Sequence, residues 1–265
     1  MIFDHFSFVL HKENYGLIKT YKLRLVILMY SYNEMAVEEL NKWKIQMRKK
    51  PTLVEKASKG MQNKFNGMLP KKYHEIITSA IKNMIKVVLV GSKYITKEPY
   101  INLSLQEREE LVAQKTKTYK TTAMIEGAGI GAGGILLALA DLPLLLSIKI
   151  KFLYDIAAIY GFDVNDYKER IYILYVFQLA FSSKSNVNEV FDRIENFEAY
   201  YRTLPKDINS FDWRVFQQEY RDYIDLAKLL QLVPGIGAFV GAYVNTKLID
   251  KLSETAVQAY RMRIL

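Results

Sequence analysis

The stretch Glu126-Gly-Ala-Gly-Ile-Gly-Ala-Gly-Gly134, followed shortly by Asp141-Leu-Pro143, decides the fold of this chain. From 127 to 148 the only strongly polar residues are Asp141 and Ser147. Asp141 can act as an N-cap, and Pro143 fits the first turn of a helix because that turn does not need its missing N–H. The stretch therefore predicts two apolar helical arms that meet at a break.

Glycines recur at four-residue spacing in this stretch, as in the pair Gly127 and Gly131. Such spacing clears one helix face so that another backbone can approach closely, whereas a glycine in a solvated helix costs about 1 kcal/mol relative to alanine. We therefore expect two glycine-rich apolar segments, 124–160 and 226–250, to pack at the centre of the fold or against a membrane. The structural and packing residues in this prediction are Gly127, Gly129, Gly131, Gly133, Gly134, Asp141, Pro143, Gly161, Pro234, Gly235, Gly237, Gly241 and Asn245.

A nucleotide site is a poor interpretation of the same glycines. Gly129, Gly131 and Gly134 form a G-x-G-x-x-G pattern, but a dinucleotide-binding loop needs a strand before it. The preceding residues, 105–124, are helical by pattern, and the Gly-Lys-Ser/Thr of a phosphate-binding loop is absent.

Apolar residues elsewhere recur at three- and four-residue steps, which predicts an all-α multi-helix bundle without a sheet. A capping box at Ser104–Glu107 starts one helix, and Gly161 is a C-terminal stop with Asp163 and Asn165 as caps for the next helix. The predicted helices cover 33–50, 52–67, 73–90, 104–124, 142–160, 166–182, 187–202, 211–232 and 236–262.

Positive charge is concentrated in one region. Ten basic residues and a single acid, Glu55, lie between 42 and 72, so this stretch accounts for the whole formal charge of +9. It suits an anionic membrane surface or an acidic partner, or it is a solvated helix face. The candidate contact residues are Lys42, Lys44, Arg48, Lys49, Lys50, Lys56, Lys59, Lys64, Lys71 and Lys72.

Composition excludes several kinds of site. The chain has no cysteine, so disulfides, thiolate nucleophiles and cysteine-ligated zinc are excluded. The three histidines are His5, His11 and His74, and no two share a metal-binding helix spacing. We expect no metal and no cofactor.

The N-terminal residues differ from the rest of the chain, which predicts how it is divided into domains. Residues 1–30 form an atypical extension whose apolar run Leu25–Tyr30 is too short to span a bilayer, and residues 31–265 form a single helical domain. The break at Asp141 also leaves each apolar arm too short for a full span, although a shallow or re-entrant hairpin stays open.

Several of these motifs together resemble the EcsC family. They are the glycine run with Asp141-Leu-Pro143, Tyr160-Gly-Phe-Asp163, Val233-Pro-Gly-Ile-Gly-Ala238 leading to Asn245-Thr246, and Ala259-Tyr-Arg-Met-Arg263. The resemblance covers about 33–265. It implies a bacterial helical protein whose namesake is encoded beside the components of an ABC transporter, and it supplies no catalytic residue.

Three functions compete at this level. The first is a non-catalytic accessory protein, cytoplasmic and peripheral to the inner face of the cell membrane, whose partner is anionic lipid or a membrane protein such as an ABC transporter component. The second is a hydrolase that uses carboxylates among Glu126, Asp141, Asp155 and Asp163. The third is nucleic-acid binding by the basic stretch, which lacks a reading motif.

Overall fold

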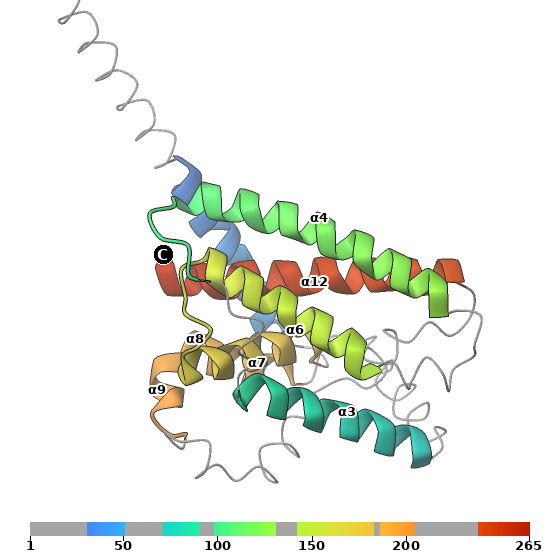
Figure 1. Ribbon diagram of the computed structural model, residues 1–265. Coiled ribbons are helices and arrows are strands. Elements are labelled where there is room, and N and C mark those ends of the chain that lie inside the picture. Colours follow the sequence, from blue (N-terminus) through green and yellow to red (C-terminus); the bar gives the residue numbers. More distant parts are fainter. Residues whose placement is uncertain (1–30, 51–70, 91–97, 131–141, 183–185, 205–237) are drawn as a thin grey trace, which may run out of the picture.

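The computed structural model describes residues 31–50, 71–90, 98–130, 142–182, 186–204 and 238–265 (Figure 1). In these ranges every regular element is a helix and none is a β-strand, which confirms the all-α prediction. In chain order they are a helix over 31–48, α3 (Lys71–Val90), α4 (Leu105–Ile130), α6 (Leu142–Ile159), α7 (Tyr167–Phe181), α8 (Val187–Glu195), α9 (Phe197–Tyr201) and α12 (Ala238–Ile264). Of the helices so described, none is both long and apolar enough to span a bilayer.

Helix α4 begins with the predicted capping box. The backbone N–H of Ser104 donates to Glu107 Oε2 at 2.7 Å, and the N–H of Glu107 donates to Ser104 Oγ at 3.3 Å. Two backbone donors at the helix start are therefore satisfied reciprocally. The helix continues past the expected end near Met124 to Ile130, because glycine lowers helix propensity without terminating a helix that has tertiary contacts.

Helices α4 and α12 lie side by side and antiparallel, and theirs is the most extensive helix–helix contact among the described elements (Figure 1). Lys120 Nζ lies 2.8 Å from Asp250 Oδ1, and Thr116 Oγ1 lies 2.8 Å from Ser253 Oγ. These cross-helix contacts define the register of the pair.

The same register sets the glycine-bearing ends of the two helices together. Continued along the pair, it places Gly129 of α4 level with Gly241 of α12, and both residues are helical. Two helical glycines at one level suit the close approach expected from their spacing, and the packing role of the glycines stays a prediction. Of the remaining residues of that prediction, Gly127 lies in α4, Pro143 in the first turn of α6 and Asn245 in α12. Gly131, Gly133, Gly134, Asp141, Pro234, Gly235 and Gly237 lie outside the described residues.

The interior of the fold is formed by α6 and α7. Every residue from 152 to 160 and from 171 to 182 is buried, as expected for helices covered on all sides. Helix α3 packs on both. The Tyr154 hydroxyl donates to the carbonyl of Val88 at 3.1 Å, and Arg170 Nε donates to that of Leu89 at 3.2 Å. These side chains satisfy carbonyls that the last turn of α3 leaves without helical partners.

Gly161 ends α6 as predicted. Its φ of +89° is a left-handed conformation that favours glycine. The N–H of Gly161 donates to Ala158 O, and the N–H of Phe162 donates to Ala157 O, both at 3.0 Å, which is a Schellman motif. Arg108 fills the space beside this turn and donates to the carbonyls of Tyr100, Leu103 and Ile159.

Two predicted boundaries were wrong. The N-cap of α7 is Asp166, whose Oδ1 accepts from the N–H of Lys168 at 3.0 Å, whereas Asp163 accepts from Asn165 in the preceding turn. A cap must sit directly before the first helical residue, and Asp163 lies too early for that. The single helix expected over 187–202 is divided at Asn196 into α8 and α9; both the backbone N–H and the side-chain amide of Asn196 donate to the carbonyl of Asp192 at this break.

The helix over 31–48 covers one end of the bundle. Its buried face consists of Ala36, Leu40 and Trp43, and the Trp43 ring meets the ring of Phe191 in α8 edge to face at 5.5 Å between centroids. The extension 1–30 and the helices expected over 52–67 and 211–232 lie outside the described residues.

The α4–α12 register predicts a specific cross-link. The chain has no cysteine, so the double variant Thr116→Cys, Ser253→Cys has a clean background. Because the two hydroxyls are in contact, we expect a disulfide to form under mild oxidation, measured as a mobility shift on non-reducing gels. The matched pair Lys117→Cys, Ser253→Cys should stay reduced, since Lys117 lies on the exposed face of α4. Equal cross-linking of both pairs would contradict the register.

Substitutions at the two residues with a left-handed backbone, Gly161 and Asn102, should affect stability differently. A Cβ at Gly161 would lie 3.1 Å from Arg108 Nη1 and 3.2 Å from Tyr100 O, so Gly161→Ala should lower the free energy of unfolding by roughly 1–3 kcal/mol in urea titrations. Asn102, with φ of 60°, is the control. Because glycine tolerates this conformation, Asn102→Gly should change stability by less than about 0.5 kcal/mol.

Candidate functional site

The last turn of α12 carries two arginines, Arg261 and Arg263, that form separate ion pairs. The side chain of Arg261 is 6% exposed, and its Nε and Nη2 donate to the two carboxylate oxygens of Glu109 at 2.7 and 2.6 Å. Its Nη1 donates to Glu39 at 2.7 Å. Glu109 also accepts from the hydroxyls of Tyr32 and Tyr160. This Arg261 cluster joins the helix over 31–48, α4, α12 and the end of α6.

The Arg261 cluster is electrostatically satisfied. Burial alone would lower the pKa of Arg261, but the hydrogen bonds with Glu109 and Glu39 outweigh it and raise the pKa above the usual range. Burial, followed by the hydrogen bond to Glu109, raises the pKa of Tyr32, and burial with the charge of Glu109 does the same for Tyr160. The arginine stays charged and the tyrosines stay neutral, so the cluster holds elements together without exchanging protons.

Arg263 makes the second pair. Its Nη1 donates to Glu169 Oε2 at 2.6 Å, and Tyr260 donates to Glu169 Oε1 at 2.6 Å. Burial raises the pKa of Glu169, and the charge of Arg263 opposes that shift. The guanidinium carbon lies 3.7 Å from the ring centroid of Phe162 and 4.4 Å from that of Tyr172. Aromatic faces and one carboxylate therefore fix the orientation of this guanidinium.

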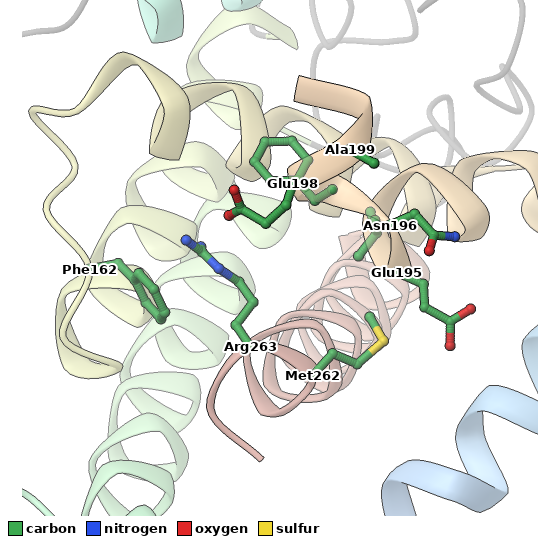
Figure 2. Close-up of a pocket in the computed structure, with 9 residues that line it drawn as sticks. Phe162, Glu195, Asn196, Glu198, Ala199, Met262 and Arg263 are labelled. Atoms are coloured by element: carbon green, nitrogen blue, oxygen red, sulfur yellow. The ribbon is translucent and has the colours of Figure 1, made fainter. Parts of the chain in front are cut away.

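A cleft of about 510 Å³ opens beside Arg263, between α8–α9 and the last turn of α12 (Figure 2). Apolar side chains and three charged ones share its wall. Figure 2 shows the guanidinium of Arg263 and the carboxylate of Glu198 pointing toward one another. The lining residues are Phe162, Ile194, Glu195, Asn196, Phe197, Glu198, Ala199, Met262 and Arg263.

The charged residues on the cleft rim are paired with neighbours. Lys168 Nζ lies 2.7 Å from Glu198 Oε2. Lys44 Nζ lies 3.3 Å from Glu195 Oε1, and Arg48 pairs with the other oxygen of the same carboxylate. The cleft therefore borders the beginning of the basic stretch.

The basic residues predicted from sequence fall into three groups. Lys44 and Arg48 face α8 through Glu195, and Lys42 pairs with Glu38 on its own helix. The side chains of Lys49, Lys50 and Lys72 are exposed. Lys71 begins α3, whereas Lys56, Lys59 and Lys64 lie outside the described residues.

The carboxylates considered for hydrolysis do not form a site where they are described. Asp155 is buried in α6 with Lys115 Nζ at 3.4 Å and the Tyr119 hydroxyl at 3.2 Å. Asp163 is exposed in the turn after α6, where it accepts from Asn165. Glu126 lies in α4 and Asp141 is outside the described residues. No group of three or more histidine, aspartate or glutamate side chains in the described ranges is arranged to hold a metal ion.

Sequence reasoning missed the residues that line and support the cleft. Arg261 and Arg263 belong to the ending that resembles the family, Glu169 is an ordinary first-turn acid of α7, and Glu109 lies one turn further into α4 among other charged residues. Basic residues in the last turn of a helix are common because they complement the helix dipole, so they carry little signal. The usable signal was their position beside Ala259 and Tyr260 on a buried helix face.

The EcsC protein family matches residues 34–265 of this chain. The chain belongs to the EcsC family. "Protein EcsC" of Bacillus subtilis (strain 168) is 47% identical over 234 residues, covering 88% of this chain and 96% of that protein. "Uncharacterized protein YdbA" of the same organism is 25% identical over 249 residues, covering 86% and 90%. No solved structure shows a significant match.

The Arg261 cluster predicts a large effect for one truncation in this EcsC-family chain. Arg261→Ala leaves the carboxylate of Glu109 buried without its cation, so the free energy of unfolding should fall by about 3–5 kcal/mol. Lys120→Ala is the control, because the Lys120–Asp250 pair is partly exposed to solvent and should contribute less than about 1 kcal/mol. Urea denaturation followed by circular dichroism measures both, and similar losses would contradict a central role for the cluster.

Proposed function

We propose that this EcsC-family protein is a non-catalytic accessory protein that binds peripherally to the inner face of the cell membrane, beside an ABC transporter. The observation that carries the membrane part is the outer face of the helix over 31–48, where an exposed isoleucine lies among lysines. The transporter link rests on the family resemblance.

The outer face of this helix has the pattern of a membrane-surface helix. Lys42 and Ile45 lie three residues apart and share a face, and Lys49 follows directly after the last residue of the helix. Ile45 is 62% exposed. Trp43 is buried on the opposite face, which keeps the lysines directed away from the bundle. An apolar side chain framed by lysines can enter the interface while the ammonium groups meet lipid phosphates.

The charge of this region also supports the proposal. Lys49, Lys50 and Lys72 make no ion pair within the described part of the chain, and each is exposed. A lysine beside an anionic bilayer contributes about 1 kcal/mol of binding free energy, and several together give stable but salt-sensitive association.

The described carboxylates support a non-catalytic role. Glu109 and Glu169 are engaged by arginines and tyrosines, and Asp155 by Lys115 and Tyr119. Each carboxylate contributes to packing contacts between helices, which is the structural use of a buried ion pair.

Liposome flotation tests the proposal. The full-length protein should float with vesicles that contain phosphatidylglycerol at low salt, and the triple variant Lys42→Glu, Lys49→Glu, Lys50→Glu should bind roughly two orders of magnitude more weakly. The matched control is Lys82→Glu, Lys86→Glu, Lys117→Glu, which makes the same charge change at exposed sites on α3 and α4. Equal losses in both triples, or no flotation of the parent protein, would overturn the proposal.

The same assay at high salt isolates the apolar contact. Screening weakens the lysine contribution, so the remaining association should depend on Ile45 and be lost in Ile45→Asp. Val87→Asp is the control, since Val87 is 51% exposed on α3.

A further inference from the structure

We propose that the cleft between α8–α9 and the end of α12 binds a free hydrophobic α-amino acid. Its carboxylate would pair with Arg263, its ammonium group with Glu198, and its side chain with the apolar wall. This goes beyond the proposed membrane association and does not depend on it.

Arg263 is prepared to receive a carboxylate. A guanidinium carries five N–H donors, and the hydrogen bond to Glu169 uses Nη1. In the part of the chain that the structure describes, Glu169 is the only acceptor of Arg263, so donors remain for a second carboxylate. The side chain is 18% exposed, and the rings of Phe162 and Tyr172 hold it in place. A guanidinium that is already ordered loses little conformational entropy on binding.

Glu198 supplies the opposite charge on the facing side of the cleft (Figure 2). The hydrogen bond from Lys168 lowers the pKa of Glu198 below its ordinary value, and the charge of Arg263 acts in the same direction. The carboxylate is therefore ionised at neutral pH. Its side chain is largely exposed, so it can accept from a ligand while it keeps the contact with Lys168.

The two facing charges match a zwitterion better than a simple anion. A ligand with only a carboxylate would meet Arg263 but also approach the negative charge of Glu198, and like charges in a partly desolvated site repel. An α-amino acid carries its ammonium group one carbon from its carboxylate, so it presents both charges to a site of this kind. Electrostatic complementarity of this kind selects one ligand class by repelling others.

The apolar wall requires a hydrophobic side chain. Phe162, Ile194, Phe197 and Met262 line the cleft beside the charged pair. The volume of about 510 Å³ lies within the range of small-molecule sites and accommodates large side chains such as those of leucine and phenylalanine. A polar amino acid would leave its side chain without hydrogen-bond partners against this wall.

Isothermal titration of the full-length protein with four probes tests the assignment. Leucine and phenylalanine should bind, whereas N-acetyl-leucine, which lacks the ammonium group, and leucinamide, which lacks the carboxylate, should each bind at least about 10-fold more weakly. Equal or tighter binding of N-acetyl-leucine would identify a carboxylate site for a peptide end and overturn the amino-acid proposal. An absence of leucine binding at millimolar concentration would also overturn it.

One variant at an exposed position locates the binding without disturbing the core. Glu198→Gln removes the negative charge from an exposed side chain and should weaken leucine binding about 10-fold while leaving N-acetyl-leucine unchanged or tighter. Glu189→Gln is the matched control, because Glu189 is an exposed, ion-paired glutamate on α8 that does not line the cleft.

Arg263→Lys tests the other half of the site. It keeps a cation beside Glu169 and loses the planar fork, so leucine binding should again fall about 10-fold. If this variant unfolds, Ala199→Asp replaces it, since Ala199 is exposed on the rim and Ala113→Asp on α4 is its control. Undiminished leucine binding in both Glu198→Gln and Ala199→Asp would place the ligand elsewhere and end the proposal.

Discussion

The bidentate ion pair between Arg261 and Glu109 connects helices that are far apart in the sequence. It fastens the C-terminal end of α12 to the beginning of α4, at the opposite end of the pair from Gly129 and Gly241. The third donor of the guanidinium reaches Glu39, so the helix over 31–48 is held at the same point. A buried guanidinium is stable only when its donors are satisfied, and this requirement places three distant segments at one location.

The outer face of the helix over 31–48 and the cleft beside Arg263 both lie next to the Arg261 cluster. The helix over 31–48 presents Ile45 and its lysines outward because Trp43 packs on Phe191 and Glu39 is held by Arg261. Arg263, which lines the cleft, lies in the same last turn of α12 as Arg261. Glu195 lines the cleft and pairs with Lys44 and Arg48, so it connects the cleft to the helix over 31–48. The cleft and the basic helix are therefore neighbours rather than independent patches.

Local signals predicted the helices well because each depends on a few adjacent residues. The capping box at Ser104 and the stop at Gly161 are read from side chains that bond to the nearby backbone. The errors have the same origin. Asp163, Asn165 and Asp166 are all residue types that cap helices, so residue type alone does not say which of them caps α7. The apolar periodicity of 187–202 likewise carries no sign of the break at Asn196. The family was also predicted correctly, because the order and spacing of its motifs are properties of the chain alone.

The sequence by itself determined the all-helical class, the positions of most helix ends, the absence of thiol chemistry and the concentration of positive charge between 42 and 72. These properties follow from composition and from interactions within a few residues. Only the tertiary structure decided that Arg261 meets Glu109, that Arg263 meets Glu169, and that a cleft opens between Arg263 and Glu198. The partners in the two ion pairs are separated by 152 and 94 residues, and no local pattern encodes which of many charges will share a buried site.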